Sequence, residues 1–65
     1  MKELNLSDNI DKLELIGKVR RFIYNSQNSL PVSITISNNR IDVIKVLEEG
    51  DFKFVIKDNL ILVTE

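Results

Sequence analysis

The chain opens with a segment whose apolar residues follow a helical pattern. Between about residue 8 and residue 25 they recur at the three- and four-residue spacing that places side chains on one face of a helix: Leu15, Ile16, Val19, Phe22 and Ile23. Ser7 and Asp8 lie at the start of the segment as candidate N-cap residues, and the polar run 25–29 ends it. We therefore expect an N-terminal helix over about residues 8–25.

The second half of the chain alternates between apolar and polar residues, as half-buried strands do. Two-residue turns at 38–39 and 58–59 and a four-residue turn at 48–51 divide it into four expected strands, over about residues 31–37, 40–47, 52–57 and 60–64. Pairing across all three turns brings apolar residues together on one face, and a one-residue slip would break that agreement. The expected fold is α+β, a single domain of residues 1–65 with the N-terminal helix packed on a four-stranded antiparallel β-meander.

Residues 40–49 also support a second interpretation. Asn39 would cap a helix that ends at Gly50, and the final hairpin would then form the wing of a winged-helix-like fold. Four β-branched residues within the segment lower its helix propensity, and two glutamates would lie at the negative end of the helix dipole. The sequence therefore favours the meander, with the winged-helix-like fold as its alternative.

The meander predicts an uncovered apolar patch. A single helix covers one face of a sheet, and the opposite face would carry five apolar residues: Ile44, Val46, Val55, Leu60 and Leu62. Exposed patches of this kind usually mark an interface. We expect a homo-oligomer, with a dimer favoured, or docking on a different protein. Alternatively, Leu4 and Leu6 of the N-terminal arm would fold across the patch. The last strand is also expected to be a sheet edge, open to strand addition.

Two further surfaces are expected on the helix. Ile10, Leu13 and Tyr24 form a second apolar group around the helix, which is a candidate secondary contact surface. A short cationic run, Lys18, Arg20 and Arg21, would supply nucleic-acid contacts if the protein binds DNA or RNA, and is otherwise a solvated face.

Composition narrows the class of function. The 65 residues include no Cys and no His, and nine basic residues nearly balance ten acidic ones, for a net charge of −1. The commonest general base and the commonest metal ligand are therefore missing, and the charge is not that of a typical nucleic-acid binder. No apolar run approaches the roughly 18 residues of a membrane span. We expect a cytoplasmic protein that is not an enzyme, with no cofactor, no small-molecule substrate and no membrane association.

The chain has no Ala and is rich in Ile and Asn, which indicates AT-rich codons. A phage or mobile element of a low-GC bacterium would fit that usage. The favoured function is a small non-catalytic protein–protein interaction module, a homo-oligomeric inhibitor or regulator that would include anti-defence proteins such as anti-CRISPRs. The alternatives are a nucleic-acid-binding transcriptional regulator and a structural subunit of a larger assembly.

Overall fold

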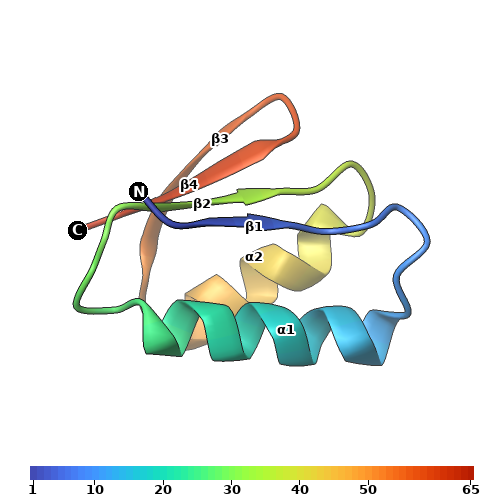
Figure 1. The fold of residues 1–65 in the computed structure, drawn as a ribbon, viewed down its shortest axis with the longest axis horizontal. Helices are drawn as coiled ribbons and strands as arrows, with labels where there is room; N and C mark the ends of the chain where they lie inside the picture. Colours follow the sequence, from blue (N-terminus) through green and yellow to red (C-terminus); the bar gives the residue numbers. More distant parts are fainter.

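Four short strands form one mixed sheet, and two helices lie against the same face of it (Figure 1). The computed structural model describes residues 1–65. Its elements follow one another along the chain as β1 (Glu3–Asn5), α1 (Lys12–Asn25), β2 (Val32–Thr35), α2 (Arg40–Glu49), β3 (Lys53–Lys57) and β4 (Leu60–Thr64). The fold is therefore α+β, as predicted. It has one helix more than the predicted meander, and its sheet is mixed instead of antiparallel.

The strands lie in the order β1-β2-β4-β3. β1 runs parallel to β2, with the N–H of Leu6 donating to the carbonyl of Thr35 at 3.0 Å and that of Ser33 donating to Lys2 at 3.0 Å. The remaining pairs are antiparallel. Parallel neighbours need a crossover connection, which α1 supplies. The prediction of an antiparallel meander is therefore wrong, and the N-terminal arm forms an edge strand instead of crossing the predicted apolar patch.

The final hairpin has the predicted register. Asp58 and Asn59 form its two-residue turn, and Ile56 pairs with Ile61 while Phe54 pairs with Val63. Asp58 adopts a left-handed φ of 55°, which Asp tolerates better than most residues. β4 lies between β2 and β3, so the prediction that the last strand is an open edge is wrong. The edges of the sheet are β1 and β3.

Residues 40–49 form α2, and the prediction of a strand over residues 40–47 is wrong. Val43, Val46 and Leu47 are buried at helical spacing. Helix propensities differ by only tenths of a kcal/mol per residue, whereas burying one such side chain contributes about 1.5–3 kcal/mol. Burial therefore outweighs the β-branched composition. The helix and hairpin of the winged-helix-like alternative are both present, but the hairpin belongs to the same sheet as β2.

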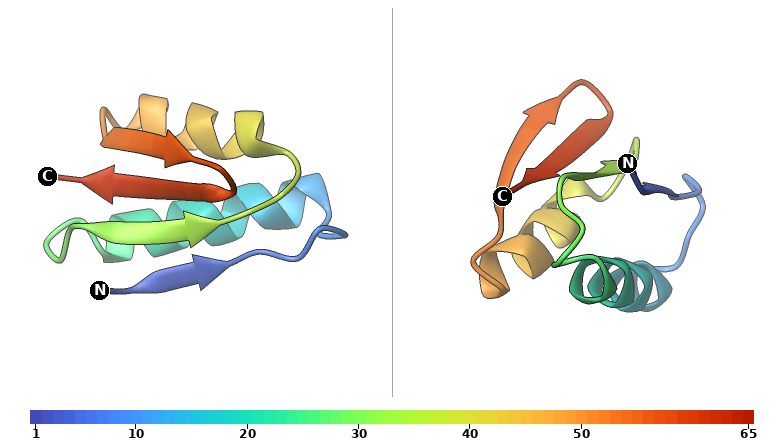
Figure 2. Two further views of the ribbon diagram at one scale, coloured as in Figure 1. Left: turned by 90° about the horizontal axis from the view of Figure 1, so that it is seen from above. Right: turned by 60° about the vertical axis from the view of Figure 1, so that its left-hand side comes forward.

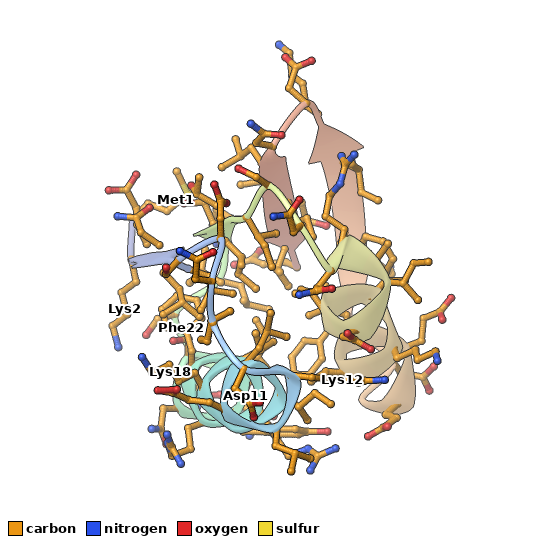
Figure 3. The ribbon with its side chains drawn as sticks, turned by 90° about the vertical axis from the view of Figure 1, so that its right-hand side faces the viewer. Met1, Lys2, Asp11, Lys12, Lys18 and Phe22 are labelled. Carbon is orange, nitrogen blue, oxygen red and sulfur yellow. The ribbon has the colours of Figure 1, made fainter.

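α1 begins at Lys12, four residues later than predicted. Asp11 is its N-cap, and a carboxylate oxygen of Asp11 accepts a hydrogen bond of 3.1 Å from the N–H of Leu13. Of the predicted core face, Leu15, Val19 and Ile23 are fully buried. Ile16 and Phe22 are half-buried and pack against the core, and Figure 3 shows the ring of Phe22 between α1 and β1.

The core fills the space between the sheet and the helix layer. Its buried apolar residues come from both helices, from β2 and the residue that follows it, and from β4: Leu15, Val19, Ile23, Val32, Ile34, Ile36, Val43, Val46, Leu47, Ile61 and Val63. Leu4 and Leu6 pack against this core from the N-terminal segment. Neither helix has the length and apolarity that crossing a membrane requires.

Candidate protein-binding surface

One face of the sheet has no secondary structure over it. Both helices lie below the sheet in Figure 1, and the view from above in Figure 2 looks directly onto the uncovered strands. We call this the outer sheet face. Strand alternation and the observed registers place ten side chains on it: Glu3, Asn5, Ser33, Thr35, Lys53, Val55, Lys57, Leu60, Leu62 and Thr64.

An apolar patch lies on the β3–β4 half of the outer sheet face. Val55 pairs with Leu62 across the hairpin, and Leu60 is two residues from Leu62 on β4. Val55 is 56% exposed and Leu60 36% exposed, while Leu62 is half-buried. We call these three residues the outer patch. They are three of the five residues that the sequence predicted for an interface.

The other two predicted interface residues do not lie on this face. Ile44 and Val46 are in α2, on the opposite side of the sheet. Val46 is a core residue with 2% exposure, and Ile44 is half-buried on the helix. Their assignment to the outer patch is wrong because it depended on a strand at residues 40–47. The outer patch is accordingly smaller than predicted.

Charged residues occupy only the two edges of the outer sheet face. Glu3 lies on β1 at one edge, and Lys53 and Lys57 lie on β3 at the other. The side chains that β2 and β4 contribute between them are all uncharged: Ser33, Thr35, Leu60, Leu62 and Thr64. The face is therefore acidic along one edge, basic along the other and neutral in the middle.

The predicted secondary contact surface is not brought together as one patch. Ile10 precedes α1 and packs against the core. Leu13 is 80% exposed in the first turn of α1. Tyr24, in the last turn, packs edge-on against Phe52. Leu13 and Tyr24 share one side of the helix but lie eleven residues apart, which is about 16 Å along its axis.

The cationic run on α1 is largely paired with acidic residues. Lys18 Nζ lies 3.6 Å from a carboxylate oxygen of Glu14 on the same helix. Arg20 Nη2 lies 3.2 Å from a carboxylate oxygen of Glu49 on α2. Arg21 is exposed and makes no ion pair within 4 Å. The three residues do not form a surface of unpaired positive charge.

A polar concavity that the sequence analysis missed lies where α2 begins. Its volume is about 560 Å³, and eight residues line it: Lys12, Ser37, Asn38, Asn39, Arg40, Ile41, Asp42 and Lys45. Lys12 Nζ is 3.7 Å from Asp42, and Arg40 donates to the carbonyl oxygen of Asp58 at 2.6 Å. Two of its three cations are thus engaged within the protein. The polar run 37–40 ahead of a helix was its only sequence signal.

Metal-binding clusters of three or more His, Cys, Asp or Glu side chains do not occur in the structure. No family model, curated protein or solved structure matches the chain. The outer sheet face, with its exposed patch and charged edges, is therefore the surface from which a function is proposed.

Proposed function

We propose that this chain is a small non-catalytic protein-interaction module, a cytoplasmic inhibitor or regulator that binds through its outer sheet face. The observation that carries the proposal is the exposed outer patch on a sheet whose other face already holds both helices. A two-layer fold buries one face of its sheet, and apolar side chains on the uncovered face gain stability when a partner excludes water from them.

A binding function fits the residues better than catalysis does. The chain has no His and no Cys, so its concavity offers neither the usual general base nor a thiol nucleophile. Of the ionisable groups there, Lys12 and Asp42 pair with each other, and Arg40 donates to the carbonyl oxygen of Asp58. An inhibitor that acts by covering a partner's surface needs no catalytic group.

Protein binding is also favoured over nucleic-acid binding. A nucleic-acid surface needs several unpaired cations that neutralise phosphates. On α1 two of the three candidates, Lys18 and Arg20, already form ion pairs. The basic edge of the outer sheet face has only Lys53 and Lys57, beside an apolar patch.

Position-specific photo-cross-linking tests the proposal. A benzophenone amino acid is introduced in place of Val55 in one variant and in place of Leu13 in a matched control. Both native residues are exposed and apolar, but they lie on opposite layers of the molecule. The purified proteins, and a lysate of the source organism that contains them, are then irradiated. We expect a discrete protein cross-link from position 55 that is absent from position 13.

A second substitution makes the test specific to the surface. Leu62→Glu places a charge beside position 55, since the two residues are cross-strand neighbours. It should abolish the position-55 product without changing the circular dichroism spectrum. Equal cross-linking from both positions, or a product that survives Leu62→Glu, would overturn the proposal.

A further inference from the structure

β3 is an edge strand with one free row of backbone hydrogen-bonding groups. It pairs with β4 on one side and with no strand on the other. Along an antiparallel pair, residues alternate between exchanging hydrogen bonds with the partner and directing their N–H and C=O groups away from it. The two-residue turn makes Lys57 and Leu60 a bonded pair, so Val55 also bonds to β4. The backbone groups of Phe54 and Ile56 therefore point to the free side.

β3 also presents exposed apolar side chains on both of its faces. Val55 lies on the outer sheet face and is 56% exposed. Ile56 points towards the helix layer and is still 42% exposed, and Figure 1 shows the hairpin rising away from the helices. A strand laid along the free edge would lie against both side chains. It would remove apolar surface from water on each face of the sheet.

α2 lies beneath the position that such a strand would occupy. Figure 2, in its view from above, shows α2 running along β3 and extending beyond it on the free side. Arg40 Nη1 donates a hydrogen bond of 2.6 Å to the carbonyl oxygen of Asp58 in the hairpin turn, so this side of α2 faces the hairpin. Ile44 is one turn further along the same side and is half-buried. It offers an apolar surface to the inward side chains of an added strand.

Lys53 and Lys57 determine which charges the added strand carries. Both lie on the outer sheet face near the two ends of β3, and neither forms an ion pair within the protein. Opposite charges that face one another across two strands stabilise the pairing, and like charges destabilise it. We infer that the free edge of β3 binds an extended segment of a different protein, in which three apolar residues lie between two acidic ones.

The register of β3 sets the order of residues in that segment. Carboxylates opposite Lys53 and Lys57, with an apolar residue opposite Val55, lie on the outer sheet face. The residues opposite Phe54 and Ile56 lie on the helix side and are apolar. The sequence Lys-Phe-Val-Ile-Lys is symmetric in charge, so one pattern serves a parallel or an antiparallel strand. A slip by one residue would turn the carboxylates towards the helix layer.

A second copy of this chain does not supply such a segment. Antiparallel pairing of two β3 strands would bring Lys53 of each copy opposite Lys57 of the other, and edge lysines commonly protect sheets against this pairing. β1 of a second copy has Glu3 as its only acidic residue, with Asn5 two positions further on. The two lysines of β3 therefore disfavour self-pairing and select an acidic strand from a different protein.

A labelled peptide tests the inference directly. Its core is Glu-Val-Val-Val-Glu between flanking threonines, and the matched control peptide has the core Lys-Val-Val-Val-Lys. Fluorescence anisotropy is followed while protein is added to about 1 mM, a concentration that detects even weak association. We expect saturable binding of the acidic peptide and binding of the basic peptide that is weaker by about tenfold or more. Equal binding of the two peptides, or no binding of the acidic one, would overturn the inference.

Charge reversal on the protein assigns the peptide to β3. Lys53→Glu with Lys57→Glu in one chain should reverse the preference, so that the basic peptide binds more tightly than the acidic one. Lys2→Glu with Lys45→Glu is the matched control, because it changes the net charge equally at two exposed lysines outside β3. This variant should keep the native preference, and circular dichroism checks that both variants fold. Reversal in both variants would show attraction to net charge alone and would remove the β3 site.

Amide hydrogen exchange, followed by nuclear magnetic resonance, tests whether the peptide adds as a strand. Excess acidic peptide should slow exchange at the N–H groups of Phe54 and Ile56 by about tenfold or more, because they become hydrogen-bonded. Asn5, whose N–H lies on the free side of β1, is the control for overall stabilisation. Equal slowing at Asn5 would contradict strand addition at β3. The same slowing at Phe54 and Ile56 when protein concentration is raised without peptide would make the occupant a second copy and overturn the inference.

The inference rests on the proposed function, because the added strand is the part of the partner that lies beside Val55, but the two can fail separately. A position-55 cross-link that is unchanged by Lys53→Glu with Lys57→Glu would leave the binding module in place and remove strand addition. An absence of any specific position-55 cross-link would remove both.

Discussion

The rings of Tyr24 and Phe52 meet edge to face, with centroids 5.5 Å apart and an interplanar angle of 74°. Tyr24 lies in the last turn of α1 and Phe52 follows α2, so the pair joins the two helices at one end of the helix layer. Both side chains lie close to Gly50, where an added Cβ would come within 2.5 Å of a Phe52 ring carbon and 2.7 Å of the Tyr24 hydroxyl oxygen. Gly50 is needed for this close approach.

The conformation at the end of α2 supports that interpretation. The N–H of Phe52 donates to Leu47 O at 3.0 Å and that of Asp51 donates to Glu48 O at 3.2 Å, the pattern of a Schellman cap. In that motif the left-handed residue is Asp51, with φ of 57°, whereas Gly50 has φ of −94°. Glycine at position 50 therefore serves packing, and its conformational freedom is not used.

We predict that Gly50→Ala lowers the free energy of unfolding by about 1–3 kcal/mol, the usual range for an inserted methyl group that clashes with packed side chains. Chemical denaturation monitored by circular dichroism measures the change. Gly50→Ala with Tyr24→Ala should show a smaller loss than the two single variants summed, because removing the Tyr24 ring frees space at the site. Full additivity would contradict a clash with Tyr24.

Gly17 is the contrasting glycine. It lies within α1, and an added Cβ would meet only a guanidinium nitrogen of Arg21, at 3.8 Å. Glycine within a helix costs about 0.5–1 kcal/mol relative to alanine. Gly17→Ala should therefore raise the unfolding free energy by about that amount in the same measurement. A loss of stability would show that the exposed side of α1 needs the space that the glycine leaves.

Two substitutions on α2 distinguish the observed helix from the predicted strand. In the meander Ile41 would face the core and Val46 the solvent, whereas in the structure Ile41 is 69% exposed and Val46 is buried. Ile41→Lys should therefore change the unfolding free energy by no more than about 0.5 kcal/mol, as ordinary surface substitutions do. Val46→Lys should cost about 3 kcal/mol or more, because it buries an unpaired charge. The reverse ranking would favour a strand at residues 40–47.

The same segment explains how far the sequence could predict the fold. Residues 41–47 satisfy two periods at once, since Ile41, Val43 and Leu47 fit a strand face while Val43, Val46 and Leu47 fit a helix face. Lys45 would fall on the apolar face of such a strand, whereas in the structure it is exposed on α2. The spacing of apolar residues alone cannot distinguish a helix from a strand here, because burial against α1 and the sheet decides which of the two forms.

The β3–β4 hairpin could be predicted from the sequence, whereas the non-local pairing of β1 could not. The hairpin of β3 and β4 depends on a two-residue turn and adjacent pairing, so its register, and with it Val55 and Leu62 of the outer patch, followed from the sequence. β1 has three residues and pairs in parallel with β2, about thirty positions away. Nothing near Glu3 in the sequence identifies that neighbour. The acidic edge of the outer sheet face could therefore not be predicted without the strand order.

The two helix N-termini differ in how they are capped, and this gives another stability prediction. Asp11 accepts a hydrogen bond from the first turn of α1, whereas Asn39 makes no side-chain hydrogen bond to α2. Asp11→Ala should therefore cost about 1 kcal/mol of unfolding free energy, the usual value of an N-cap. Asp8→Ala is the matched control, since no hydrogen bond of the Asp8 side chain is present. Equal losses from both variants would contradict a specific cap at Asp11.

Asn39 adopts φ of 60° and ψ of 31°, which is left-handed. Glycine enters that region without the steric cost of a Cβ, and no capping bond is lost with the asparagine side chain. Asn39→Gly should therefore preserve the unfolding free energy or raise it by up to about 1 kcal/mol. Asn38→Gly makes the same chemical change one residue earlier, where φ is not positive. It should lower stability because it adds freedom to the unfolded chain and removes the 3.5 Å hydrogen bond that Asn38 Nδ2 donates to the carbonyl oxygen of Asp8. A marked loss from Asn39→Gly, larger than that from Asn38→Gly, would mean that the Asn39 side chain caps α2 in solution.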